Sequence, residues 1–269
     1  MPRSAGGVRS QPAVVASLGR DRLRIAACVV LITAIAWTYL IHLDRQMSQS
    51  VGHDAMMRAM GMAMHAPWSA TDLLFTFMMW TVMMVGMMSP SAAPVVLLYS
   101  GMQQRQGKGS LSASVLLFAL GYLAVWTGFS GVATLVQWAL HEAALLASTM
   151  AVASPRMAGA ILVAAGAYQL TPVKSACLTQ CQSPLGFLMG NWRDGSVGAF
   201  TMGLRHGVYC LGCCWALMGV LFAVGVMNLV WVAALTAFIL AEKVGRSGAV
   251  VARIGAIALL GWGVVLLIG

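Results

Sequence analysis

Long apolar runs separated by short polar or basic segments dominate the chain. Seven runs are candidates for membrane helices: 24–42, 72–99, 112–139, 157–171, 202–225, 228–242 and 251–268. A helix needs about 20 apolar residues to cross the hydrocarbon core, so the fourth and sixth runs are short. Pro155 and Pro172 also bound the fourth run. The pattern predicts an all-α polytopic membrane protein of about seven transmembrane helices, or six spans plus a half-helix.

The composition supports a membrane protein and changes how the charge is interpreted. Of the 269 residues, 60% are hydrophobic and 9% are charged, whereas a soluble domain carries about 25% charged residues. A formal net charge of +9 would suggest nucleic acid in a soluble chain. Here the sixteen Lys and Arg lie between apolar runs, where they anchor helices at a membrane surface. We expect a lipid bilayer as partner and no nucleic acid.

The basic residues also predict an orientation. With seven spans and the N-terminus inside, thirteen of the sixteen Lys and Arg are cytoplasmic, and three, Arg45, Arg58 and Arg156, are outside. This distribution follows the positive-inside rule and predicts a cytoplasmic N-terminus. We expect residues 1–23 to form a disordered basic tail and 24–269 a single helical membrane domain.

A Met/His-rich outside loop is predicted at 44–71. Its sequence HDAMMRAMGMAMHAPW offers Met60, Met62, Met64 and His65 as candidate ligands. Thioethers are soft ligands for Cu(I), and imidazole extends the range to Cu(II). The pattern therefore favours copper. The alternative is an interfacial amphipathic helix whose methionines dip into lipid.

Methionines recur in the second predicted span, which contains FMMWTVMMVGMMSPSAAP. Met83 and Met87 are one helical turn apart, with Met84 and Met88 beside them. A track of thioethers leading from the outside loop is one interpretation. The other is that polarizable methionines pack a helix interface beside Gly86.

The fifth run contains RHGVYCLGCCWALM, the most concentrated set of soft ligands. On a helix, His206, Cys210, Cys213 and Cys214 fall within an arc of about 100°, and Met202 extends the stripe. This face predicts a metal site, with His206, Cys210 and Cys213 as its core and Cys214 at its edge. The alternative is that the cysteines are small buried hydrophobes and the histidine marks the membrane boundary.

Cys177 and Cys181 precede this run and are four residues apart. On a helix they share a face, where they could chelate a soft metal or form a redox pair. Two unrelated thiols at a membrane surface are the equal alternative. The last two spans carry Glu242 and Lys243 among apolar and small residues, and we expect them to be scaffold.

Together, MMWTVMMVGMMSPSAAP and RHGVYCLGCCWALM resemble the predicted metal-binding integral membrane proteins of bacteria. This family includes membrane copper chaperones for polyphenol-oxidase-type copper enzymes. The resemblance covers roughly 70–268 and implies a multi-helix membrane fold, copper handling and an apo copper enzyme as recipient. It also implies ligand character at the matching positions: Met83, Met84, Met87 and Met88, and His206, Cys210, Cys213 and Cys214.

The leading hypothesis is a protein of the bacterial inner membrane that is not an enzyme. It captures Cu(I) through Met, His and Cys ligands and delivers the ion to a partner copper enzyme; another soft metal stays open. One alternative is a copper transporter that moves the ion across the inner membrane. A second is a membrane thiol oxidoreductase that uses Cys177 and Cys181. The hypothesis leaves room for a homo-oligomer or an accessory membrane subunit.

Overall fold

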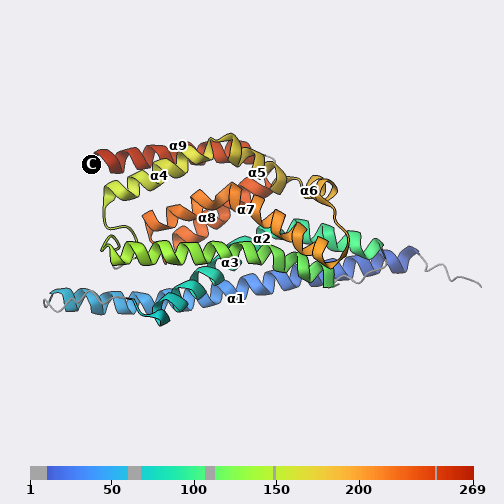
Figure 1. The fold of residues 1–269 in the computed structure, drawn as a ribbon, viewed down its shortest axis with the longest axis horizontal. Helices are drawn as coiled ribbons and strands as arrows, with labels where there is room; N and C mark the ends of the chain where they lie inside the picture. The colour runs from blue at the N-terminus through green and yellow to red at the C-terminus, as the bar shows by residue number, and fades with distance from the viewer. Residues whose placement is uncertain (1–10, 60–67, 107–112, 148–149, 246) are drawn as a thin grey trace, which may run out of the picture.

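A computed structural model describes residues 11–59, 68–106, 113–147, 150–245 and 247–269, and in the first range it describes side chains for 23–47. The described residues form an elongated bundle of helices without a named strand (Figure 1). The helices are α1 (Gln11–Ala59), α2 (Ala70–Arg105), α3 (Ala113–Glu142), α4 (Pro155–Gln169), α5 (Pro172–Gln182), α6 (Pro184–Asn191), α7 (Gly195–Val224), α8 (Leu229–Val244) and α9 (Gly248–Ile268). In Figure 1, α4 and α9 lie along one side of the bundle and α1 along the other. The all-helical prediction is confirmed for this part of the chain.

Five helices are long and apolar enough to cross a membrane: the 23–47 part of α1, and α2, α3, α7 and α9. The short helices α4 and α5 together could form a sixth, broken span, because they meet at a bend of 64°. Helix α8 has only 16 residues. The fourth and sixth runs are therefore short, as predicted, whereas seven spans and a cytoplasmic N-terminus stay predictions.

Helix α1 extends beyond its apolar run at both ends. It begins at Gln11 and ends at Ala59, so it includes part of the predicted tail and part of the predicted outside loop. The candidate ligands of that loop, Met60 to His65, lie outside the described residues. The division at residue 23 and the outside position of the loop stay predictions.

The bend between α4 and α5 follows from local sequence. Pro172 has no amide hydrogen to continue the ladder of α4, but its fixed φ suits the first turn of a new helix. The Thr171 hydroxyl caps α5 by accepting a hydrogen bond from the Lys174 amide at 3.3 Å. The chain therefore turns at Thr171 and carries Lys174, Cys177 and Cys181 away on a separate helix.

Glycines let the main helix pairs touch backbone to backbone. A Cβ on Gly203 of α7 would collide with the Phe118 carbonyl oxygen of α3, and one on Gly121 of α3 would collide with the Phe200 carbonyl oxygen of α7. In the other pair, a Cβ on Gly159 of α4 would lie 2.7 Å from the Gly263 carbonyl oxygen of α9. Small residues at such contacts are typical of helices that pack in membranes. The packing confirms that these glycines serve close helix approach.

The core of the bundle contains both sulfur-rich sequences. Met83, Met84, Met87 and Met88 of α2 are buried, and they belong to the same apolar cluster as the three cysteines of α7. The methionine stripe therefore faces protein. Gly86, on the same helix, packs against Ala36 and Trp37 of α1, which accounts for a close contact at that point.

Candidate metal centre

Helix α7 places three thiols at one level of the bundle. Cys210, Cys213 and Cys214 are each 1% exposed. The thiols of Cys213 and Cys214 both reach the Cys210 carbonyl oxygen, at 3.1 and 3.0 Å. These contacts keep the three sulfurs on the side of α7 that faces α2, α5 and α8. The sequence prediction that the cysteines share one buried face is therefore geometrically sound.

Helices α2 and α3 supply polar groups around Cys210. The Tyr122 hydroxyl of α3 lies 3.1 Å from the Cys210 sulfur and also donates to the Met88 carbonyl oxygen at 3.2 Å. The Ser91 hydroxyl of α2 lies 3.9 Å from the same sulfur and donates to the same carbonyl at 2.9 Å. Two hydroxyls therefore connect the thiol of α7 to the α2 backbone next to Pro90.

Lys243 of α8 ends inside this group of sulfurs. Its ammonium donates to the Cys210 sulfur at 2.9 Å and lies 3.4 Å from the Ser91 hydroxyl. The Cys214 sulfur and the Met88 thioether sulfur are each 3.9 Å from the same nitrogen. The side chain is buried, with 6% of the residue exposed. A cation is thus surrounded by one hydroxyl and three sulfurs.

Helix α5 brings the other two thiols of the region against α7. The Cys181 and Cys213 sulfurs are 4.0 Å apart. The Cys177 sulfur lies over Gly212, 2.8 Å from where a Cβ would be, so the missing side chain of Gly212 makes room for it. Both thiols therefore lie against α7, and their role as metal ligands or a redox pair stays a prediction. Cys28, the remaining described cysteine, is exposed on α1.

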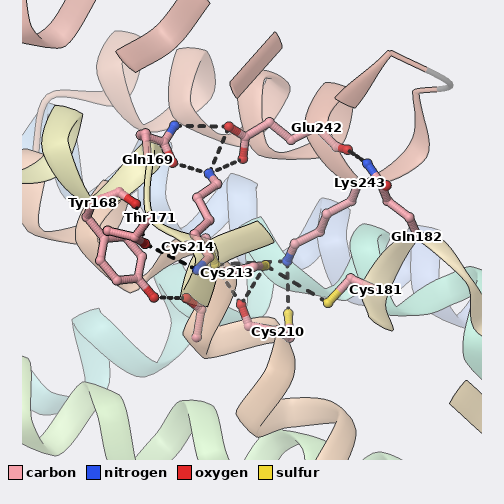
Figure 2. A network of polar contacts seen from close by, with 12 residues as sticks. Tyr168, Gln169, Thr171, Cys181, Gln182, Cys210, Cys213, Cys214, Glu242 and Lys243 are labelled. Carbon is pink, nitrogen blue, oxygen red and sulfur yellow. Dashed lines mark hydrogen bonds and ion pairs between the residues drawn. The ribbon is translucent and has the colours of Figure 1, made fainter. Parts of the chain in front are cut away.

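A second buried lysine lies close to the thiols, but its partners are different. The Lys174 ammonium is 2.7 and 2.9 Å from the two carboxylate oxygens of Glu242, and it also contacts the Gln169 amide oxygen. Gln169 donates to Glu242 at 3.0 Å, and Gln182 donates to the Glu242 backbone carbonyl at 2.7 Å. Figure 2 shows Glu242 turned toward Gln169 and Lys243 turned toward the cysteines.

His206, predicted in the core of the site, is held by aromatic rings. Its ring centroid is 5.0 Å from that of Phe187, 5.7 Å from Tyr122 and 6.2 Å from Phe118. The residue is 2% exposed, and its Nδ1 has no hydrogen-bond partner among the described residues. Its link to Cys210 runs through Tyr122. Met202 lies with Phe118 and Phe187 in a cluster separate from that of the cysteines.

The donors that converge in this region are mostly sulfurs, which are soft ligands. Across the described ranges, no three His, Cys, Asp or Glu side chains are grouped as a metal-binding set. Two thiols, of Cys210 and Cys214, and the Met88 thioether converge around the Lys243 nitrogen. Thiol and thioether ligands select Cu(I), whereas zinc in structural sites takes four ligands from cysteine and histidine.

A family model described as PpoB2, a copper chaperone, matches residues 77–266. The chain belongs to this copper chaperone family. Membership implies that the protein binds copper and serves a copper enzyme, and it suggests a metal-handling role rather than a catalytic one. No curated protein and no solved structure matches the chain.

The matched range of the copper chaperone family includes the whole sulfur site and Lys243, whereas Met60, Met62, Met64 and His65 precede it. Helix α8 places Glu242 and Lys243 in buried polar clusters, which was not predicted from the sequence, and the expectation that α8 is scaffold stays a prediction. The signal that could have found them is an ionisable pair inside an apolar run, since such residues in membrane segments are usually functional.

Proposed function

We propose that this member of the copper chaperone family is a membrane protein that captures Cu(I) in the sulfur site and delivers it to a partner copper enzyme. The supporting observation is that the Cys210, Cys214 and Met88 sulfurs all lie within 3.9 Å of the buried ammonium nitrogen of Lys243. Two thiols and a thioether form a soft ligand set, and such a set favours Cu(I) over harder ions.

Delivery proceeds by ligand exchange. The Met/His segment that holds Met60, Met62, Met64 and His65 collects copper on the outside, and the buried methionines of α2 lie along the way inward. Cys181 and Cys213, 4.0 Å apart, form a second pair of sulfurs beside the first. An ion can therefore change ligands one at a time. No covalent bond of a substrate is made or broken, in keeping with a function that is not enzymatic.

The proposed location is the bacterial inner membrane, with the N-terminus in the cytoplasm. The five long apolar helices support a multi-pass arrangement, and the thirteen basic residues on the inner side in the seven-span topology support the orientation. The proposed recipient is an apo enzyme of the polyphenol-oxidase type, which receives copper as it matures.

Anaerobic titration with Cu(I) against a chromophoric chelator tests the site. We expect Cys210→Ala to weaken binding by more than about tenfold, because even changes next to a metal ligand cost 10- to 100-fold in affinity. His206→Ala should weaken it less, because the histidine ring packs among aromatic rings, including that of Tyr122, whose hydroxyl contacts Cys210. Cys28→Ala, at an exposed position on α1, is the matched control.

Equal stoichiometry and equal affinity in Cys210→Ala, Cys213→Ala and the Cys28→Ala control would reject the sulfur site. Circular dichroism establishes that each variant is folded, and copper content after purification reports how much of the ion it retains. A loss of binding in all three would show damage to the fold instead of loss of a ligand, and the comparison would then be repeated with serine.

Transport is the second candidate, and the buried thioethers of α2 favour it. Met79, Met83, Met84, Met87 and Met88 are all buried along more than two helical turns, so a chain of soft ligands leads toward Cys210. Copper flux into sealed vesicles decides between the candidates. Flux would reject a simple chaperone, and tight binding without flux would reject the transporter.

A further inference from the structure

Lys243 raises a question that the proposed function does not answer: why an ammonium lies among sulfurs that would hold a metal cation. Its contacts within the described chain are the Cys210 and Cys214 sulfurs, the Met88 sulfur and the Ser91 hydroxyl. None of these is a carboxylate. Burying a charge is costly unless an opposite charge compensates it, and the closest atom able to do so is the Cys210 sulfur.

The neighbouring carboxylate is already engaged. Glu242 precedes Lys243 directly, but both of its oxygens contact the Lys174 ammonium, at 2.7 and 2.9 Å. Gln169 adds a hydrogen bond to the same carboxylate. The Lys174 and Glu242 charges cancel within their own cluster. The sulfurs around Lys243 are therefore the groups that remain to compensate its positive charge.

We propose that the ammonium of Lys243 is a place-holder for Cu(I). It fills the position between Cys210, Cys214 and Met88 when copper is absent, leaves when the ion enters, and returns when the ion is handed on. This inference rests on the proposed function, because it assumes that these sulfurs bind Cu(I). Both occupants are monovalent cations, so exchanging them changes the charge of the buried site only by any proton that a thiol releases on binding the ion.

The position of Lys243 in α8 gives the ammonium somewhere to go. The residue lies in the last turn of the helix, directly before Val244 and the capping Gly245. Val244 is exposed. A lysine stem of four methylenes can bury its carbons while its charged end moves toward a helix end or membrane surface. The carbonyls at a helix C-terminus also attract a cation.

Competition between the two cations has a measurable consequence. Removing the ammonium should tighten Cu(I) binding and slow its release. We expect Lys243→Leu to lower the dissociation constant for Cu(I) by about tenfold, in the middle of the range usual for coupling between two binding events. The rate of transfer to a chelator should fall by a similar factor. Leucine is chosen because methionine would add a ligand.

The matched control is the double variant Lys174→Leu/Glu242→Gln. It also removes a buried lysine charge close to the cysteines, but the contacts of that ammonium within the described residues are with Glu242 and Gln169. Its affinity for Cu(I) should equal that of the wild type. If Lys243→Leu binds Cu(I) more weakly than the wild type while this control does not, Lys243 supports the ligands instead of competing with the ion, and the place-holder is rejected.

A second measurement uses the unaltered protein and needs no variant to fold. An amine-acetylating reagent is applied with and without Cu(I), and mass spectrometry reports modification at each lysine. Displacement predicts that copper raises modification of Lys243 several-fold and leaves Lys174 protected. Equal protection of Lys243 in both states overturns the proposal. If the wild type binds no Cu(I) at all, it is the proposed function that fails, and the titration shows this separately.

Discussion

Two lysines are buried a short distance apart, and they are compensated in opposite ways. Lys174 has a carboxylate and an amide as partners, all at direct contact. Lys243 has a thiol at 2.9 Å, a hydroxyl at 3.4 Å and two further sulfurs at 3.9 Å. The first cluster is saturated by one carboxylate of opposite charge and one neutral amide, both hard partners. The second consists of three soft sulfurs and one neutral hydroxyl.

Two consecutive residues of α8, Glu242 and Lys243, contribute to the two clusters. Consecutive residues on an α-helix point about 100° apart, so α8 directs Glu242 toward α4 and α5 and Lys243 toward α2 and α7 (Figure 2). The comparison teaches that burial of a charged residue does not by itself indicate function. What distinguishes the two sites is whether the partners of the charge could also serve another ion.

The largest effect on stability should come from removing the carboxylate of the Lys174–Glu242 pair. Glu242→Gln leaves the Lys174 ammonium buried without an anion, and removing one partner of a buried pair costs about 3–5 kcal/mol of unfolding free energy. Thermal and denaturant unfolding of the detergent-purified protein measure this loss. Adding Lys174→Leu to the same chain should recover most of it, because the cluster is then neutral. A stable single variant, or a double variant as unstable as the single one, would show that Lys174 and Glu242 do not act as a pair.

Removing the thioether of Met88 should lower the affinity for Cu(I) more than it lowers the unfolding free energy. Met88→Leu keeps the volume, so the unfolding free energy should change by less than about 1.5 kcal/mol. Affinity for Cu(I) should fall about tenfold, because a soft ligand is lost. Met218→Leu is the control, since Met218 is equally buried in the same cluster and is not one of the proposed ligands. Equal losses in both variants would assign the copper effect to general packing.

The smallest effect is expected at Ser91. Its hydroxyl lies 3.4 Å from the Lys243 ammonium and donates to the Met88 carbonyl oxygen. Ser91→Ala removes the neutral hydrogen bond to the Met88 carbonyl oxygen, worth about 0.5–1.5 kcal/mol in unfolding free energy, and the longer contact with Lys243. The affinity for Cu(I), measured by chelator competition, should fall less than in Met88→Leu, because Ser91 supplies no sulfur to the site. A loss as large as that of Cys210→Ala would make Ser91 a ligand.

The sequence predicted the parts of the fold that depend on periodicity. Each apolar run coincides with a helix. The two short runs correspond to α4, which ends before Pro172, and to α8, which has only 16 residues. The cysteines of α7 and the methionines of α2 are buried, as their spacing on a helix suggests. These features depend on the helical repeat alone, which a single sequence displays.

The partners of the site come from tertiary packing, which helical spacing cannot predict. Cys214 was expected at the edge of the site and His206 in its core, since their angles around α7 favour that order. His206 and Cys214 are each four residues from Cys210, about 6 Å along the axis in opposite directions, so spacing alone does not decide which of them joins it. Helix α8 meets α7 at the level of Cys210 and Cys214, where Lys243 contacts both. Height along the helix, together with the approach of α3 and α8, decided which side chains meet.

The backbone contact between α3 and α7 has a consequence for the speed of loading. Gly121 and Gly203 let the two helices pack backbone to backbone, and this closely packed pair carries Cys210 and Tyr122. Helix α8 reaches the same site only through the flexible stem of Lys243. We therefore expect the Lys243 side chain to move by rotation about its torsion angles, without movement of the helices. Rotations of single side chains take far less time than movements of whole helices, so an ion could be exchanged while the bundle around it stands still.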